Sequence, residues 1–207
     1  MLYDKDLREP LFDYLEGYFG KVRILEEKQI GKSRADIVMV MEKALVGIEI
    51  KSDADTYARL AGQVKDYDLF FDYNIVVTGT THGIHIKEHV PEWWGIITAE
   101  EADNSIDFYM YRKMQANKGV SLKKQLSLLW RPELAHIQNL NGMAKYKEKS
   151  KKFVIEKIGE KIPAEILKPQ MSEELFERDY NLIAEQIREF RVQESRNALR
   201  IRKKSSW

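Results

Sequence analysis

The sequence predicts an α/β fold, in which helices flank a mixed β-sheet and an all-helical extension follows. Three observations support this prediction. Short segments rich in branched apolar residues, typical of strands, recur up to about residue 112 and then stop. Only the segment 42–44 separates two of them, so these two are expected to pair as an antiparallel hairpin. A segment of helical period after Lys51 is long enough to cross between parallel strands.

The first expected element is a helix over residues 4–19, because apolar residues recur there at three- and four-residue spacing and Gly20 can end the helix. Its apolar face needs a sheet to cover. We expect strands at 22–25, 36–41, 45–50, 74–78, 95–98 and 106–111. The crossover helix follows N-cap candidates at 52–55 and runs to about residue 72.

Helical period dominates after residue 113, and we expect helices at 150–161, 163–168 and 172–201. The pattern predicts an α/β core over 1–112 and a basic helical extension over 113–207. The core holds 13 basic and 21 acidic residues and the extension 21 and 12, so the net charge of +1 hides about −8 and +9. This asymmetry suggests an acidic chemical site and a surface that faces a polyanion.

Composition excludes several classes of protein. At 207 residues, 43% hydrophobic and 32% charged, the chain can bury one good core and is neither disordered nor fibrous. The absence of cysteine excludes disulfides, cysteine-ligated zinc, iron–sulfur clusters and thiol nucleophiles. No run approaches the roughly 20 apolar residues that span a bilayer, and the N-terminus lacks the order of a secretion signal. We expect a cytoplasmic protein with no membrane partner.

Three ionisable residues fall at adjoining ends of the predicted hairpin. Asp36 begins its first strand, and Glu49 and Lys51 end its second. Side chains alternate along a strand, so Glu49 and Lys51 point to one face and Ile50 to the other. Charges at the ends of apolar strands cost stability unless they are paired or bind a metal. The pattern therefore predicts a metal-binding or catalytic site.

Two carboxylates beside an ammonium suit a hard divalent cation. Mg²⁺ is expected, with Mn²⁺ as the alternative, because Mg²⁺ binds a few carboxylate oxygens and keeps waters that a phosphate can displace. Such a metal can polarise a phosphoryl oxygen and lower the pKa of an attacking water. Lys51 would orient that water or offset charge in the transition state.

Ala35-Asp36 and Glu49-Ile50-Lys51 resemble the site motif of the PD-(D/E)XK nuclease superfamily, with Ala35 in place of the motif's proline. The resemblance implies a restriction-endonuclease-like sheet flanked by helices. It also implies that Asp36 and Glu49 bind metal together with the Ile50 carbonyl, and that Lys51 assists the attacking water. The implied activity is Mg²⁺-dependent hydrolysis of nucleic acid, with DNA as the expected partner.

On the next helix, Gln63 and Tyr67 form a Gln-X-X-X-Tyr pattern similar to an accessory motif in exonuclease-like branches of that superfamily. Arg59, Gln63 and Tyr67 are four apart and share a helical face. We expect Gln63 to act in catalysis by orienting Lys51 or a substrate oxygen, and Arg59 and Tyr67 to bind substrate. A solvated arginine, an exposed amide and a core aromatic are the simpler interpretations. Residues up to about 100, including GIEIKSDADTYARLAGQV and VPEWWGII, resemble a bacterial family of uncharacterised nuclease-like proteins.

Other ionisable residues allow further hypotheses. Glu16 or Glu27 could add a carboxylate to the site, although both are also typical solvated acids. His82, His85 and His89 share one helical face and could bind a catalytic zinc, or could belong to a short surface helix.

Basic residues cluster near the end of the chain, at Arg188, Arg191, Arg196, Arg200, Arg202, Lys203 and Lys204. Such a surface favours salt-dependent, sequence-tolerant contacts with nucleic acid, although a solvated helix face has the same composition. The leading hypothesis is therefore a Mg²⁺-dependent nuclease acting on DNA. The alternative is a non-catalytic module that keeps this fold and binds nucleic acid or another partner. The pattern does not favour any oligomeric state.

Overall fold

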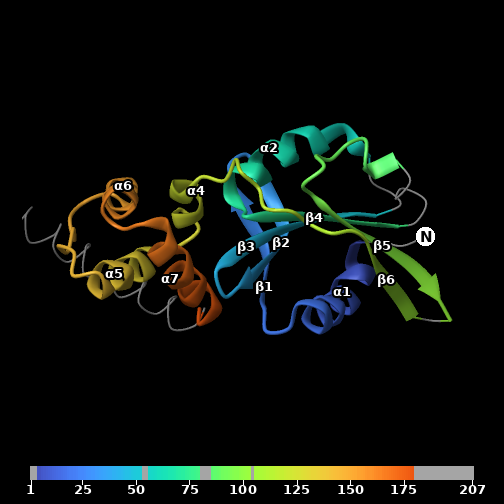
Figure 1. Cartoon of the computed structure of the whole chain (residues 1–207), viewed down its shortest axis with the longest axis horizontal. Helices are drawn as coiled ribbons and strands as arrows, with labels where there is room; N and C mark the ends of the chain where they lie inside the picture. The colour runs from blue at the N-terminus through green and yellow to red at the C-terminus, as the bar shows by residue number, and fades with distance from the viewer. Residues whose placement is uncertain (1–3, 53–55, 80–84, 104, 180–207) are drawn as a thin grey trace, which may run out of the picture. The chain divides into compact units, whose positions relative to one another are not determined.

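The computed structural model describes residues 4–52, 56–79, 85–103 and 105–179. Figure 1 shows a sheet with helices on both faces, followed by further helices. The strands are β1 (Arg23–Ile30), β2 (Ser33–Met41), β3 (Ala44–Lys51), β4 (Tyr73–Gly79), β5 (Gly95–Ala102) and β6 (Ser105–Arg112). The helices are α1 (Asp4–Phe19), α2 (Leu60–Phe70), α4 (Leu122–Leu126), α5 (Arg131–Leu140), α6 (Lys151–Lys161) and α7 (Ala164–Phe176). The predicted α/β fold class is confirmed.

The six strands lie in the sheet in their sequence order. β1, β2 and β3 pair antiparallel, β3, β4 and β5 pair parallel, and β6 returns antiparallel to β5. The predicted hairpin and parallel crossover are therefore confirmed. The crossover helix begins later than predicted, with a 3₁₀ turn at Tyr57–Arg59 before α2, and it ends at Phe70 because Phe71 is already extended.

The two faces of the sheet bury separate apolar clusters. On one face, α1 inserts Leu7, Leu11 and Leu15 against side chains of β2, β3 and β4. On the other face, α2 contributes Leu60 and Tyr67, which pack in a second cluster. Figure 1 shows the two helices on opposite sides of the sheet. Both faces of the central strands are thus covered, as their almost continuous apolar sequence requires.

The cluster on the α2 face continues into the helices that follow β6, with buried side chains from α4, α5, α6 and α7. Residues up to Phe176 form one compact unit. The prediction that 1–112 and 113–207 are separate domains stays a prediction. None of the described helices is both long and apolar enough to cross a bilayer.

One helix replaces two predicted segments, 163–168 and 172–201, over the part that the structure describes. α7 runs through Pro169 because Leu167, Met171 and Leu175 recur every four residues on one buried face. Packing of that face outweighs the cost of an internal proline. The basic residues predicted to contact nucleic acid, from Arg188 onward, lie outside the described residues.

Asp72 joins these helices to the sheet. Its carboxylate is buried and accepts hydrogen bonds from the Leu45 N–H at 2.9 Å and from Gln125 Nε2 at 2.8 Å. Lys168 Nζ on α7 lies 2.5 Å from its other oxygen. Every oxygen of this buried carboxylate is therefore satisfied, as burial of a charge requires.

Gly47 lets α2 approach β3 closely. A Cβ at this position would collide with the ring of Phe71 and would lie 2.7 Å from Tyr67 Cδ1. Two aromatic rings therefore occupy the space that the side chain of any other residue would fill.

We expect Gly47→Ala to lower the free energy of unfolding by about 1–3 kcal/mol, because overpacking forces the rings and the strand apart. Gly17→Ala is the matched control, since Gly17 lies in α1 and a Cβ added there would meet nothing within 4 Å. The control should be neutral or stabilising by up to about 1 kcal/mol. Urea unfolding measures both, and equal stability of the two variants would contradict this packing.

Candidate active site

Asp36 and Glu49 face each other where the pairing of β2 and β3 ends. The antiparallel register pairs Ile37 with Ile48, so Asp36 and Glu49 occupy the next opposing positions. The Ile50 N–H donates to Asp36 Oδ2 at 2.9 Å and holds this carboxyl group against β3. The structure thus brings together the residues that the hairpin pattern singled out.

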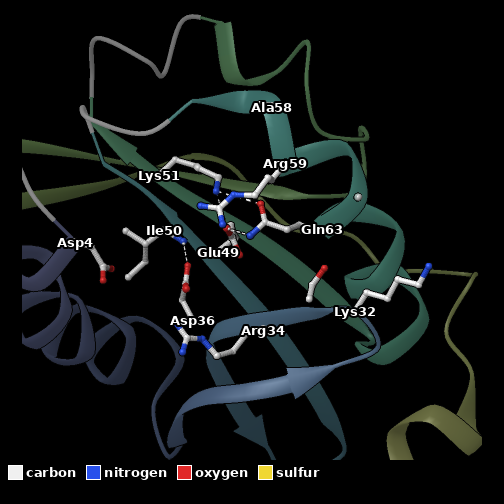
Figure 2. A pocket seen from close by; sticks show the side chains of 12 residues that line it. Asp4, Lys32, Arg34, Asp36, Glu49, Ile50, Lys51, Ala58, Arg59 and Gln63 are labelled. Atoms are coloured by element: carbon white, nitrogen blue, oxygen red, sulfur yellow. Dashed lines mark hydrogen bonds and ion pairs between the residues drawn. The ribbon is translucent and has the colours of Figure 1, made fainter.

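Glu49 is 1% exposed, and both of its oxygens accept hydrogen bonds. Lys51 Nζ lies 2.7 Å from Oε1, and the Gln63 amide donates to the same oxygen. Lys51 Nζ also donates to Gln63 Oε1 at 3.1 Å. Figure 2 shows these three side chains pointing toward one another from β3 and α2. Gln63 thus lies beside Lys51, as predicted, and it also donates a hydrogen bond to Glu49.

Tyr67 completes this network from below the surface. Its hydroxyl donates to Glu49 Oε2 at 2.6 Å and accepts from the Asp36 N–H at 3.3 Å. Burial and the neighbouring Glu49 carboxylate raise the pKa of Tyr67, so the phenol stays a neutral donor. Tyr67 is fully buried, and its hydroxyl supports Glu49. Its predicted role in substrate binding stays a prediction.

A cavity of about 670 Å³ opens beside these residues. Its lining consists of Asp4, Lys32, Ser33, Arg34, Asp36, Glu49, Ile50, Lys51, Ala58, Arg59, Gly62 and Gln63. Arg59 is exposed at this cavity, as its predicted contact with a phosphate would need. Figure 2 shows side chains from α1, the β1–β2 turn, β3 and α2 around it.

Three charged residues of this cavity were not predicted from the sequence: Asp4, Lys32 and Arg34. Asp4 precedes Leu7 by three positions on the buried stripe of α1, and this spacing could have placed it toward the sheet. Arg34 precedes Asp36 by two positions on β2, and strand alternation could have placed both on one face. Lys32 depends on how the β1–β2 turn folds, which spacing alone does not give.

Neither Glu16 nor Glu27, the two candidates for an additional carboxylate, lines the cavity. Glu16 is exposed on α1. Glu27 pairs with Arg8 at 2.8 Å and with Arg34 at 2.5 Å. Asp4, also on α1, does line the cavity. Arg8 holds its Oδ2 at 2.9 Å, and its Oδ1 is buried without a hydrogen-bond partner among the described residues.

The surroundings of Asp36 disfavour the charged form of its carboxyl group. Burial, first, and then the Glu49 carboxylate raise its pKa from 3.8 to about 7. The Ile50 N–H and Lys51 act in the opposite direction without cancelling this shift. Two acids that repel each other at a cavity favour the arrival of a cation between them.

The histidine hypothesis finds no support in the described part of the chain. His82 lies outside it. His89 stacks on Tyr57 with ring centroids 4.1 Å apart, and His85 is exposed near Glu88. Within residues 4–52, 56–79, 85–103 and 105–179, no three His, Cys, Asp or Glu side chains are grouped to hold a metal ion.

Comparisons with known proteins place the sequence beside phage proteins. Residues 3–200 match the family model described as Bacteriophage P4 protein cII. Protein cII of Enterobacteria phage P4 is 23% identical over 147 residues, which are 69% of this chain and 55% of that protein. The chain therefore spans about half the length of this curated relative. The chain is also similar to a solved structure of Pyrococcus furiosus SfsA in complex with Ca²⁺. The match covers 51% of this chain and 60% of the SfsA chain, at 14% sequence identity and a TM-score of 0.33. A likeness at this level does not define a shared fold.

The raised pKa of Asp36 predicts how stability depends on pH. The folded protein holds a proton on Asp36 up to about pH 7, whereas the unfolded chain releases it near 3.8. Without divalent metal, the free energy of unfolding should therefore fall as pH rises from about 4 to about 7. Asp36→Asn removes this dependence and keeps an acceptor for the Ile50 N–H.

We expect Asp36→Asn to be more stable than the natural protein at about pH 8, by on the order of 4 kcal/mol, and of similar stability at about pH 4. Urea unfolding in chelator at the two pH values measures the difference. A variant that is less stable at the higher pH would show that Asp36 is not strained.

Proposed function

The chain belongs to the bacteriophage P4 protein cII family, and we propose that it is a divalent-metal-dependent phosphodiesterase that acts on DNA. The observation that carries this proposal is the convergence of Asp36, Glu49 and Lys51 beside one cavity. The same residues form the Asp…Glu-X-Lys pattern that resembles the PD-(D/E)XK nucleases. The cations that line the cavity attract the negatively charged phosphates of a nucleic-acid backbone.

The donor set fits Mg²⁺, with Mn²⁺ as a substitute. Asp36 and Glu49 supply carboxylate oxygens, and burial together with repulsion from Glu49 raises the pKa of Asp36. The Ile50 carbonyl is the third proposed ligand. Two carboxylates leave room for waters, which Mg²⁺ retains and a phosphate can replace. When bound, the metal would supply Lewis acidity to the phosphoryl group and lower the pKa of an attacking water.

Lys51 and Gln63 act beside the metal ligands in this proposal. Lys51 Nζ lies between Glu49 Oε1 and Gln63 Oε1, so its position is fixed before any substrate arrives. An ammonium held in this way stabilises negative charge that develops on the phosphoryl oxygens. Gln63 accepts a hydrogen bond from Lys51 and donates one to Glu49. Movement of the Lys51 ammonium away from Glu49 would therefore break its hydrogen bond to Gln63 as well.

Tyr67 and Asp4 have supporting roles. Tyr67 fixes the second oxygen of Glu49, which leaves the first oxygen facing the cavity side where Lys51 and Gln63 lie. Donors that hold a metal-binding carboxylate from behind orient it and commonly raise metal affinity by about 10–100-fold. Asp4 adds a buried oxygen without a described partner at the same cavity, which adds to its attraction for cations.

We expect cleavage of linear DNA in Mg²⁺ or Mn²⁺ and none in chelator. Asp36→Asn and Lys51→Ala should each lower the rate by about 100-fold or more, because the first removes a ligand and the second removes transition-state charge stabilisation. Lys43→Ala is the matched control, since Lys43 is exposed in the turn at the far end of the same hairpin.

Gel analysis of products from linear, circular, single-stranded and branched DNA measures these rates. Cleavage that survives both Asp36→Asn and Lys51→Ala would rule out this site. Salt-sensitive binding of DNA without cleavage in any metal would favour the non-catalytic module instead.

A further inference from the structure

The turn between β1 and β2 is fixed to α2 by one carboxylate. Asp66 Oδ2 accepts hydrogen bonds from the Lys32 N–H at 3.1 Å and from Ser33 Oγ at 2.7 Å. Ile30 pairs with Ser33, so the loop consists of Gly31 and Lys32 alone. Gly31 has a φ of +56°, which a two-residue hairpin loop requires at this position and which favours glycine.

Close packing and a second set of hydrogen bonds make this turn rigid. A side chain at Gly31 would collide with the Asp66 carboxylate. Gln29 Nε2 donates to the Gly31 carbonyl at 3.2 Å and to the Ser33 carbonyl at 2.8 Å. The turn is therefore held by hydrogen bonds to Asp66 on one side and to Gln29 on the other, although its residues are largely exposed.

This rigid turn forms one wall of the active-site cavity. Lys32 lines the cavity from the turn, and Ser33 and Arg34 line it from the start of β2. Ala58 and Arg59 line it from the 3₁₀ turn before α2, and Gly62 lines it from α2. Figure 2 shows Lys32 and Asp4 at opposite sides of the pocket. Lys32 and Arg34 make this side of the cavity a basic wall, whereas the third cation, Lys51, lies beside Glu49.

The cations of the basic wall differ in their availability. Arg34 is paired with Glu27 at 2.5 Å. Lys32 is exposed, and its ammonium has no ion pair among the described residues. The fixed turn removes the entropy cost of ordering the backbone, although the Lys32 side chain still loses rotamer freedom when it binds. Because its ammonium has no competing ion pair to break, Lys32 is the better placed of the two to take a phosphate.

We propose that the β1–β2 turn, held by Asp66, is a phosphate-binding wall in which Lys32 contacts a backbone phosphate of the nucleic acid next to the reacting one, opposite Arg59. This inference rests on the proposed function for the chemical class of its ligand. The inference concerns the path of a nucleic-acid strand through the cavity, and binding alone can test it without catalytic turnover.

The test measures binding of fluorescein-labelled DNA, as single strand and as duplex, to the Asp36→Asn protein by fluorescence anisotropy in chelator over a range of salt concentrations. Adding Lys32→Ala should raise Kd at low salt roughly fivefold. It should also reduce the slope of log Kd against log salt by about 0.9 for duplex or about 0.7 for single strand, as expected for one lost phosphate contact. Adding Lys43→Ala should change neither. Equal behaviour of the two lysine variants overturns the inference.

Asp66→Ala separates a positioned wall from general attraction. It removes a negative charge, so general attraction predicts tighter binding of DNA. It also removes the acceptor that holds the turn, so the proposed wall predicts weaker binding and a smaller salt slope. Unchanged or tighter binding by Asp66→Ala overturns the positioning claim.

Failure of this inference and failure of the proposed function are distinguishable. Binding that depends on Lys32 in a protein that cleaves no substrate keeps the wall and overturns the phosphodiesterase. Cleavage by the natural protein, with binding indifferent to Lys32, keeps the phosphodiesterase and overturns the wall.

Discussion

The site depends on satisfying a carboxylate that the fold buries almost completely. Glu49 ends an apolar strand at the edge of a cavity and is 1% exposed. A buried charge costs several kcal/mol unless it is paired and hydrogen-bonded. Lys51, Gln63 and Tyr67 together meet this requirement, and two of the three come from α2. The position of α2 on the sheet is therefore also the condition for an ordered site.

Three consecutive residues of α2, which point in different directions around the helix, fix its docking. Gly47 admits the Tyr67 ring at the level of the strand. Asp66 ties the helix to the β1–β2 turn. Asp68 accepts hydrogen bonds from Asn74 and from the indoles of Trp93 and Trp94. Hydrogen bonds and packing that look structural thus set the distance between the carboxylates, the ammonium and the basic wall.

Sequence reasoning predicted the parts of the site that follow from short-range geometry. The connection between the two strands, expected at 42–44 and found at 42–43, is short enough to require a hairpin. A hairpin puts Asp36 opposite Glu49, so strand alternation was enough to predict this pair. The burial of Tyr67 depends on Gly47 in β3, because only a residue without a side chain leaves room for the tyrosine ring. Spacing within α2 does not reveal this contact. Asp4 and Lys32 depended on how α1 and the turn dock, and long-range packing of this kind leaves little trace in local periodicity.

The central claim is that Asp36 and Glu49 bind a divalent cation, and calorimetric titration of Mg²⁺ or Mn²⁺ into the protein without nucleic acid tests it most directly. Because the pKa of Asp36 is about 7, binding must displace its proton when the pH is below that value. Titrations in two buffers of different ionisation heat should show release of most of one proton per metal at about pH 6.5 and almost none at about pH 8.5. Absence of binding, or the same proton count at both pH values, would contradict the account.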